Sequence, residues 1–261
     1  AFDGELVTRA ERAGADCRFE TQVAALAADR TARLTDGSTL RPRLIVGADG
    51  PRSAVGRAIG RVNAELVETR QITVPLRDPH RATDIFLSAE FPGGYGWLFP
   101  KGRMANLGVG VVPAARARLK PLLNQLHRRL VEQGRVGAAV HGLTGGAIPV
   151  GGMLDPRGRL GAIPVLLAGD AAGLTNPVTG AGIAAAVVSG RLAGRAAADW
   201  LAGETDALDE FAEEVEDLFK GALDRAVRRR REILQSYDSG AGPTPAALRR
   251  GWIAYPEYWA A

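Results

Sequence analysis

The sequence has little cysteine and little lysine. Cys17 is the single cysteine among 261 residues, so no disulfide can form within the chain. A lone cysteine is typical of a reducing compartment, and we expect a cytoplasmic protein in which Cys17 is a small buried residue of a strand, with a reactive thiol as the alternative. Lys101, Lys120 and Lys220 are the only lysines, so the net charge of +4 comes almost entirely from arginine.

Long apolar runs are also missing. A membrane span needs about 18 or more apolar residues, and the nearest approach, 178–201, is interrupted by Arg191 and Arg195. No secretory leader is visible, because the first ten residues alternate charged and apolar side chains. Basic residues nowhere interleave with aromatics as in a recognition module, so we predict no nucleic-acid partner. A hydrophobic content of 46% predicts a globular protein with a packed core.

The first 48 residues predict a mixture of helix and strand. Residues 2–15 have the apolar spacing of a helix, and residues 17–27 alternate like a strand. Asp36-Gly37 predicts a tight hairpin. The apolar run 44–48 predicts a buried strand, and a second such strand is expected at 165–168.

The sequence pattern changes in the middle of the chain. Between residues 62 and 112, short β-rich pieces alternate with Pro and Gly turns, which predicts an antiparallel sheet. The expected strands are Gln71–Leu76, Asp84–Phe91, Trp97–Phe99 and Ala105–Val112. Within 114–133, leucines recur at helical spacing and predict a helix packed on the core.

Two long helices are expected after residue 180. The first carries small residues four apart, along which another backbone could approach closely: Gly182, Ala186, Gly190, Gly194 and Ala198. The second, 206–234, ends in Arg228–Arg231. We favour a solvated helix end there over a membrane-facing basic patch. The aromatic tail that follows is expected to dock on the body.

Two predicted strands end in an aspartate beside a glycine, at Asp49-Gly50 and Gly169-Asp170. Ligands of open α/β sheets bind at the carboxyl ends of strands, where a carboxylate can accept hydrogen bonds from ligand hydroxyls. The run 176–183 then leads into a helix, whose N-terminal amides favour a group that becomes anionic. The alternatives are an ordinary Asp-Gly turn and a glycine-rich helix entry used for packing alone.

These runs carry a resemblance to known flavoproteins. Leu44–Ser53 resembles the second flavin fingerprint of the aromatic-hydroxylase-like FAD enzymes, and Leu167–Ile183 resembles their third. Pro92–Gly102 resembles the Pro-x-x-Tyr-x-Trp-x-Phe-Pro signature of the geranylgeranyl reductase family. The resemblance covers about residues 2–201.

The resemblance implies where a cofactor and a substrate would bind. Asp170 would bind the ribityl or diphosphate region of FAD, Gly182 and Ile183 would lie under the isoalloxazine ring, and Val23 would meet the adenine through its backbone. The expected FAD-binding residues are Val23, Asp49, Gly50, Gly169, Asp170, Pro177, Gly180, Ala181, Gly182 and Ile183. Tyr95, Trp97 and Phe99 would line a lipid pocket. Alternate strand residues share one face, and the alternative for such an aromatic face is plain core.

The sequence lacks the Gly-x-Gly-x-x-Gly turn with which such enzymes begin. Gly108-Val109-Gly110 does not replace it, because Pro113 follows in a strand-like context. We therefore expect a truncated chain, with unpaired edges on the strands that end near Ala48 and Ala168.

The expected fold is α/β (α+β overall). It comprises a Rossmann-like FAD-binding domain, incomplete at its N-terminus and formed by residues 1–61 and 153–203. An antiparallel-sheet substrate domain at 62–152 and a C-terminal helical region at 204–261 complete it.

The resemblance implies an FAD-dependent reductase of C=C bonds in a prenyl, geranylgeranyl-type lipid, with NAD(P)H or another reductant as electron donor. No catalytic side chain is assigned, and no metal is expected. An FAD-dependent monooxygenase, halogenase or quinone-linked oxidoreductase of the same superfamily is an alternative. A non-catalytic remnant or a lipid-binding module without flavin is another. Peripheral contact with a membrane stays open, and no oligomeric state is predicted.

Overall fold

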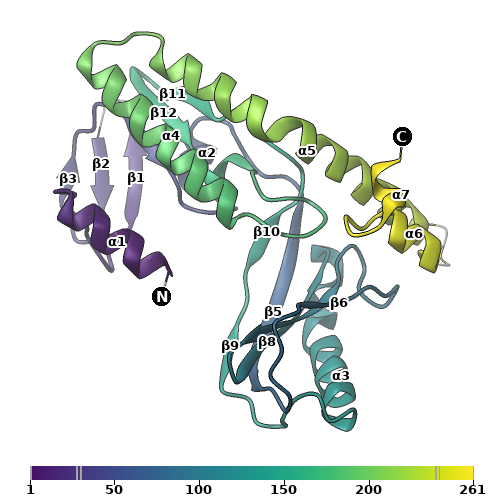
Figure 1. The fold of residues 1–261 in the computed structure, drawn as a ribbon. Helices are drawn as coiled ribbons and strands as arrows, with labels where there is room; N and C mark the ends of the chain where they lie inside the picture. Colours follow the sequence, from purple (N-terminus) through teal and green to yellow (C-terminus); the bar gives the residue numbers. More distant parts are fainter. Residues whose placement is uncertain (1, 28, 30, 239, 241, 261) are drawn as a thin grey trace. The chain divides into compact units, whose positions relative to one another are not determined.

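The computed structural model describes residues 2–27, 29, 31–238, 240 and 242–260. It divides into two compact units. The N-terminal unit comprises Ala1–Ile45 and Arg159–Val165, and the main unit comprises Val46–Gly158 and Leu166–Ala261. Figure 1 colours the chain from purple at the N-terminus to yellow at the C-terminus.

The N-terminal unit contains a helix and a small antiparallel sheet of order β1-β2-β3. Its elements are α1 (Phe2–Arg12), β1 (Val23–Ala27), β2 (Thr31–Leu34) and β3 (Thr39–Leu40). Strands β2 and β3 flank the turn in which the Ser38 amide donates to Asp36 Oδ1 over 2.8 Å. Gly37 has a φ of 86°, which a residue with a side chain rarely adopts. The hairpin predicted from Asp36-Gly37 is confirmed.

Two predictions for this unit are wrong in detail. Helix α1 ends at Arg12 rather than at residue 15, because Gly14 takes a left-handed φ of 95°. The strand expected from Cys17 begins only at Val23, after a turn in which Glu20 has a φ of 55°. Cys17 therefore lies outside any strand and is half-buried, not a buried strand residue.

The main unit is built on an antiparallel sheet in the order β10-β5-β8-β7-β6, with β9 also paired to β5. Its strands are β5 (Leu66–Pro75), β6 (Asp84–Phe86), β7 (Gly96–Lys101), β8 (Met104–Val111), β9 (Gly142–Thr144) and β10 (Ala147–Pro149). The central pair, β5 and β8, is in register from Glu68 opposite Val111 to Pro75 opposite Met104. The predicted antiparallel sheet is confirmed, although β5 is longer and β6 shorter than expected.

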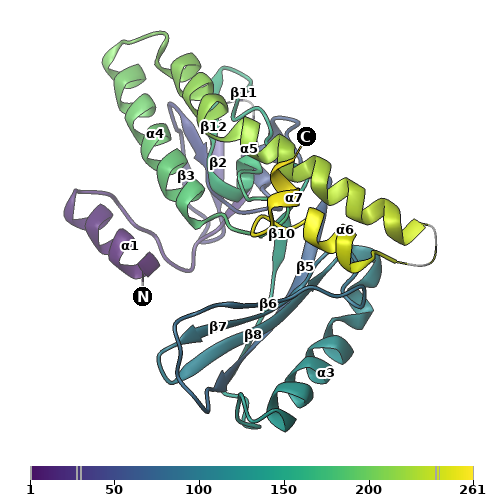
Figure 2. The same ribbon diagram turned by 45° about the vertical axis from the view of Figure 1, so that its right-hand side comes forward.

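One face of this sheet is covered by α3 (Leu119–Glu132), which follows the 3₁₀ segment η1 (Pro113–Arg118) (Figures 1 and 2). The predicted leucine stripe is confirmed as core, since all its members are buried: Leu119, Leu122, Leu123, Leu126 and Leu130. They pack in one cluster with sheet residues such as Leu98 and Leu107, both fully buried. Full burial of each such side chain stabilises the fold by about 1.5–3 kcal/mol.

A second sheet contains β11 (Arg157–Leu160), β12 (Ile163–Leu167) and β4 (Ile45–Gly47) in the order β11-β12-β4. The division between the two units passes through these strands. All five residues of β12 are buried, as predicted, whereas Val46 of β4 is 39% exposed. The expectation of an unpaired edge on the strand that ends near Ala168 is wrong, because β12 lies between two partners.

Helices α4 (Ile183–Ala202) and α5 (Ala207–Asp238) lie side by side in both views. Helix α4 buries Ala185, Ser189 and Leu192 rather than the predicted small-residue stripe. A Cβ added at Gly190 or Gly194 would meet no atom of the described residues within 4 Å. The expected close approach is found at Ala186, because a Cβ added at Gly169 would lie 3.4 Å from its Cα. It is not found at Gly190 and Gly194 among the described residues, because this part of the helix packs through a different face.

The C-terminal segment contains α6 (Pro245–Arg250) and α7 (Pro256–Trp259), which lie near α5 (Figure 2). Tyr258 is only 2% exposed, so the aromatic tail docks as expected. The prediction of a solvated end for Arg228–Arg231 is wrong for Arg229 and Arg230, which are 6% and 7% exposed. Since α5 continues to Asp238, the run lies inside the helix, and two of its arginines face the body.

Candidate functional site

A groove of about 390 Å³ lies in the main unit where β4 and β12 end. We call it the strand-end groove. It is lined by Ala48, Gly50, Ile148, Ala168, Gly169, Asp170, Thr175, Gly180, Gly182, Ile183, Ala186 and Gly190. Six of the expected FAD-binding residues are therefore brought together, although they come from three separate stretches of sequence.

Asp170 lies in the 3₁₀ segment η2 (Gly169–Ala172), which follows β12 directly. The hydroxyl of Thr175 donates to Asp170 Oδ1, and the amide of Gly169 donates to Ser189 Oγ over 3.0 Å. Gly169 and Gly173 have left-handed φ values of 57° and 70°. The tight turn they permit holds the aspartate at the strand end, in the wall of the groove.

Asp49 has a different local role from Asp170. Its carboxylate accepts hydrogen bonds from the Ser53 hydroxyl at 2.5 Å and from the Ala54 and Val55 amides at 2.7 and 3.2 Å. These groups begin helix α2 (Ala54–Ala58), so the carboxylate satisfies its N-terminal amides. Asp49 does not line the groove, whereas Gly50, with a φ of 83°, does. Its expected contact with a cofactor stays a prediction.

Two polar residues outside the predicted set connect this region. Asn63, which is 9% exposed, donates through Nδ2 to the carbonyls of Pro51 at 3.0 Å and Asp170 at 2.9 Å. Arg52 Nη2 lies 2.5 Å from the carboxylate of Glu68, a residue of β5 that is 6% exposed. Neither residue has a sequence signal by itself, because its partners are fixed only when distant segments pack.

The loop 176–182 closes on Asn176. The Asn176 side-chain Oδ1 accepts hydrogen bonds from the backbone amides of Val178 and Thr179, both at 3.0 Å. The backbone amide of Asn176 donates to the Ala181 carbonyl over 2.9 Å. Gly180 has a left-handed φ of 68°. The loop ends at Gly182, the N-cap of α4, where a Cβ would lie 3.1 Å from Asp170 Oδ1. The helix N-terminus and its partial positive charge are thus held at the groove without a covering side chain.

A second, larger cavity of about 550 Å³ opens beside the same loop. We call it the aromatic cleft. Tyr95 and the β7 residues Trp97 and Phe99 form one wall, with ring centroids 5.7 Å apart for the first pair and 5.9 Å for the second. Phe219 and Leu223 of α5 line it as well. The three aromatics share a face, as predicted, and that face borders a cavity.

Two polar contacts fix these rings. The Trp97 indole N–H donates to Gln71 Oε1 over 3.0 Å, and the Tyr95 hydroxyl donates to the Thr179 carbonyl. Burial raises the pKa of Tyr95 to about 12, so its phenol is neutral at physiological pH. A Cβ at Gly108 would overlap the indole of Trp97. The Gly108-Val109-Gly110 run lies in strand β8, as predicted. The absence of a side chain at Gly108 makes room for the Trp97 ring.

The groove and the cleft share four lining residues: Ile148, Gly180, Gly182 and Ile183. The shared loop is therefore a common wall, and the two spaces meet at the start of α4. Among the other expected residues, Ala181 lines the cleft. Pro177 is buried and lines a separate cavity of about 30 Å³, which Val67, Tyr95 and Trp97 also line.

Val23 begins β1 in the N-terminal unit, so its expected contact with the adenine stays a prediction. In the part of the chain that the structure describes, no group of three or more His, Cys, Asp or Glu residues could hold a metal ion. Of the helices within the described ranges, none is both long and apolar enough to cross a membrane.

Sequence reasoning missed the contribution of α5. The motifs that carry the sequence resemblance end at about residue 201, yet Phe219, Ala222 and Leu223 form part of the cleft wall. The helical spacing of Phe219 and Leu223 was a usable signal for an apolar face. It could not reveal that this face would border a cavity rather than the core.

Two family models match this chain. Residues 67–147 match the geranylgeranyl reductase catalytic domain, and residues 2–94 match an FAD binding domain. Digeranylgeranylglycerophospholipid reductase from Methanocella arvoryzae is 32% identical over 91% of this chain and 64% of that protein. Digeranylgeranylglycerophospholipid reductase 2 from Methanopyrus kandleri is 34% identical over 85% and 62%. The chain spans less than two thirds of the length of these relatives.

Solved structures agree with the expected fold class. A geranylgeranyl bacteriochlorophyll reductase-like protein from Thermoplasma acidophilum superposes with a TM-score of 0.75 at 22% identity, covering 96% of this chain and 70% of that one. A probable FAD-dependent monooxygenase from Pseudomonas aeruginosa gives a TM-score of 0.62 at 26% identity, covering 89% and 68%. The α/β fold with antiparallel sheets is therefore confirmed as that of FAD-binding oxidoreductases. Together, these matches show a chain that is similar to the geranylgeranyl reductase catalytic domain over residues 67–147 and to an FAD binding domain over residues 2–94.

Proposed function

We propose that this protein is an FAD-dependent reductase of C=C bonds in a prenyl lipid. One observation carries the proposal: a glycine-lined groove at a helix N-terminus and an apolar aromatic cleft meet at the loop 180–183. Such an arrangement suits a flat redox cofactor in one space and an isoprenoid chain in the other. The matches to an FAD binding domain and to a geranylgeranyl reductase catalytic domain support the same assignment.

The residues of the strand-end groove fit FAD. Gly182 places no side chain over the N-terminus of α4, and the Asp170 carboxylate at the strand end is suited to accept ribityl hydroxyl hydrogen bonds. Bound FAD would supply hydride from its reduced ring, with NAD(P)H or another reductant as the source of electrons. The uncovered N-terminus of α4 would favour negative charge at the ring edge.

The aromatic cleft would position the alkene and exclude water. Its wall is largely apolar, with Trp97 fixed by Gln71 and Tyr95 fixed by Thr179. Among the described residues that line the cleft, Tyr95 carries the only ionisable side chain. Its raised pKa keeps it protonated, so the cleft holds no charge that would oppose an isoprenoid chain. Orientation next to the cofactor is thus the contribution of the protein.

The substrate class follows from this chemistry and from the relatives. An uncharged cleft bordered by three aromatic rings suits a geranylgeranyl-type chain, and the curated relatives are named as reductases of a digeranylgeranyl phospholipid. A substrate of that kind resides in membranes, so we propose peripheral access to a membrane surface for a protein whose single cysteine is typical of the cytoplasm. Flotation with liposomes measures peripheral membrane binding. Recovery of all the protein below the lipid layer would exclude such binding.

A direct test is anaerobic turnover. The protein, loaded with FAD and reduced chemically, is mixed with a geranylgeranyl phospholipid, and the lipid is analysed by mass spectrometry. We expect a gain of two hydrogens for each reduced bond. Absence of any saturated product, with FAD bound, would contradict the proposal.

A monooxygenase is the second candidate, favoured by the structural likeness to the Pseudomonas aeruginosa protein. The same assay in air separates the two. A monooxygenase adds an oxygen atom to the product, whereas a reductase gives saturated lipid without added oxygen, in lower yield in air because oxygen also oxidises reduced flavin.

A further inference from the structure

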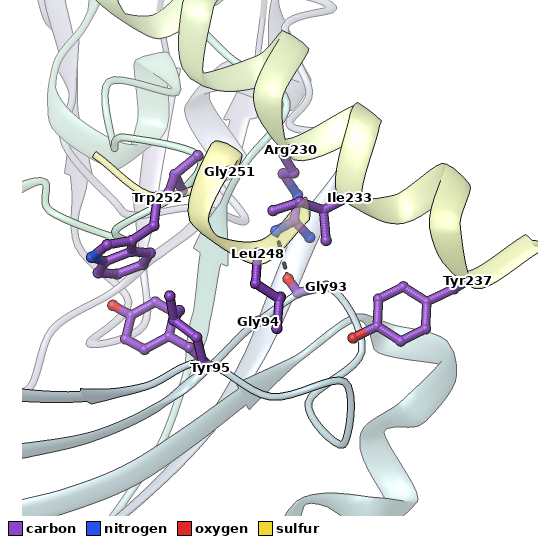
Figure 3. A pocket seen from close by; sticks show the side chains of 11 residues that line it. Gly93, Gly94, Tyr95, Arg230, Ile233, Tyr237, Leu248, Gly251 and Trp252 are labelled. Carbon is purple, nitrogen blue, oxygen red and sulfur yellow. Dashed lines mark hydrogen bonds between the residues drawn. The ribbon is translucent and has the colours of Figure 1, made fainter. Parts of the chain in front are cut away.

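Tyr95 separates two spaces in the main unit. Its ring lines the aromatic cleft on one side and a cavity of about 30 Å³ on the other. The small cavity has room for roughly two water molecules at most, and Figure 3 shows the residues around it. Its apolar walls include Leu87, Ile233 and Leu248. The Tyr95 ring is therefore a partition between the cleft and the space beneath the C-terminal segment.

Trp252 lies directly behind this partition. Its indole meets the Tyr95 ring edge-on, with centroids 4.9 Å apart and an interplanar angle of 70° (Figure 3). On its other side the phenol is held by the hydrogen bond to Thr179. The backbone of Tyr95 is fixed as well, because its carbonyl accepts from the Gly110 amide over 2.9 Å. With Trp252 in place, the spaces behind the ring are small cavities of about 30 Å³ each, which are too small to hold a phenol ring.

The position of Trp252 depends on close packing of α6 against α5. A Cβ at Gly251 would lie 2.0 Å from Ile233 Cδ1 and 2.7 Å from its Cγ1, so any side chain at this position would force Ile233 to move. Arg230 of α5, 7% exposed, donates through Nη1 to the Gly93 carbonyl over 2.5 Å. Burial lowers its pKa to about 10, so it stays a cation at physiological pH.

A second contact ties α5 to the segment that leads into Tyr95. The Tyr237 hydroxyl lies 3.2 Å from the Ala89 carbonyl and 3.3 Å from that of Phe91. Together with the Arg230 contact, it clamps the chain before Tyr95 to the C-terminal helices. The C-terminal segment is therefore a structural part of the cleft, although it lies beyond both family matches.

We propose that Trp252 is a specificity-determining residue that sets the depth of the aromatic cleft by backing Tyr95. This inference rests on the proposed function. A prenyl chain that fills the cleft ends against the phenol ring, and a longer chain has to leave its last unit in water or displace that ring. Removal of the indole frees the ring to move into the vacated volume, which lengthens the cleft. Selection of chain length thus depends on a residue that does not line the cleft.

The test compares Trp252→Ala with two matched variants. Trp252→Phe keeps an aromatic ring behind Tyr95, and Trp259→Ala removes an indole of the same tail that is 58% exposed and contacts Tyr258 instead. Isothermal titration with farnesol, geranylgeraniol and a longer prenyl alcohol gives the length preference without turnover. The kcat/KM values for the corresponding lipids give it with turnover.

For Trp252→Ala we expect the preference for the longest over the shortest chain to rise by about tenfold or more, which is the scale on which an apolar pocket discriminates chain length. Trp252→Phe should stay near the wild type, and Trp259→Ala should match it. An unchanged length preference in folded Trp252→Ala protein would overturn the inference. Should that variant fail to fold, Trp252→Leu, which keeps an apolar side chain, serves for the same comparison.

The same experiments distinguish a failure of the proposed reductase function from a failure of the inference about Trp252. Wild-type protein that binds prenyl alcohols but never reduces them contradicts the reductase assignment, while the binding data still decide the role of Trp252. Wild-type protein that binds no prenyl alcohol overturns both.

Discussion

Asn63 Nδ2 donates a hydrogen bond to the backbone carbonyl of Asp170 over 2.9 Å, across 107 residues of sequence. The same amide donates to the Pro51 carbonyl over 3.0 Å. One buried side chain thereby connects the turn after β4 to the turn after β12, the two places where the strand-end groove takes its shape. Because Asn63 lines neither cavity, we regard it as a positioning residue for both turns.

Asn63→Ala should lower both stability and FAD affinity. Two buried carbonyls lose their donor, and an unsatisfied buried polar group costs about 1–3 kcal/mol. Urea unfolding measures the stability, and FAD titration followed by flavin fluorescence measures the affinity. Asn124→Ala, at an exposed position of α3, is the control and should change neither. A loss of stability without any change in FAD affinity would show that the two turns keep their shape without this brace.

Asp170→Ala should weaken FAD binding. The variant would lose the proposed hydrogen bonds from the cofactor to this carboxylate, each worth roughly 1.5–3 kcal/mol for a charged group, which is about a tenfold to hundredfold change in Kd. The same FAD titration measures it. Asp217→Ala, on the exposed side of α5, removes the same charge elsewhere and should leave Kd unchanged. Equal FAD affinity in the Asp170 variant and the wild type would remove this residue from the cofactor site.

Trp97→Ala should impair prenyl binding more than FAD binding. The indole borders the aromatic cleft but not the strand-end groove. Truncation of a buried aromatic also costs about 3–5 kcal/mol of stability, so binding is measured only on protein that unfolds cooperatively. Phe86→Ala is the comparison, since Phe86 packs against the sheet core without lining the cleft. A parallel loss of folding, FAD binding and prenyl binding would favour a purely structural role for Trp97.

Two glycine substitutions should have opposite effects on stability. In Gly108→Ala, the new methyl group overlaps the Trp97 indole, and such overpacking costs about 1–3 kcal/mol. In Gly194→Ala, the methyl group meets no described atom within 4 Å, and alanine favours the exposed helix by up to about 1 kcal/mol. Thermal unfolding of both variants gives the signs. A stable Gly108→Ala protein with unchanged tryptophan fluorescence would contradict the packing of Trp97 on β8.

Tyr95 should give the protein a pH-dependent stability at high pH. Burial raises its pKa from 10.0 to about 12, so the neutral phenol is favoured in the folded state. The resulting stabilisation is fully present below pH 10 and is lost as the pH rises through 12. The free energy of unfolding of the wild type should therefore fall relative to that of Tyr95→Phe as the pH rises from 10 to 12. Arg230, whose pKa is about 10, titrates in both proteins and cancels in the difference. A constant difference from pH 9 to 12 would mean that the phenol is solvated.

The sequence by itself determined the features that depend on local pattern. The leucines of α3 recur at the helical period, so burial of one face followed from spacing. Asp36-Gly37 specified its hairpin, because the turn needs a left-handed residue at that position. The alternation of Tyr95, Trp97 and Phe99 put three rings on one face for the same kind of reason.

Tertiary structure alone decided what these faces meet. The carboxylates of Asp49 and Asp170 follow similar strands, yet one holds the start of α2 and the other lines the groove, because different segments pack beside them. Arg230 was expected in solvent by its place in a basic run, but it is buried because α5 continues past it and the Gly93 carbonyl accepts its hydrogen bond. Periodicity depends on neighbours within a turn or a strand. The brace at Asn63, the α5 wall and the contact of Trp252 with Tyr95 depend on residues more than 100 positions apart, which come together only when the chain packs.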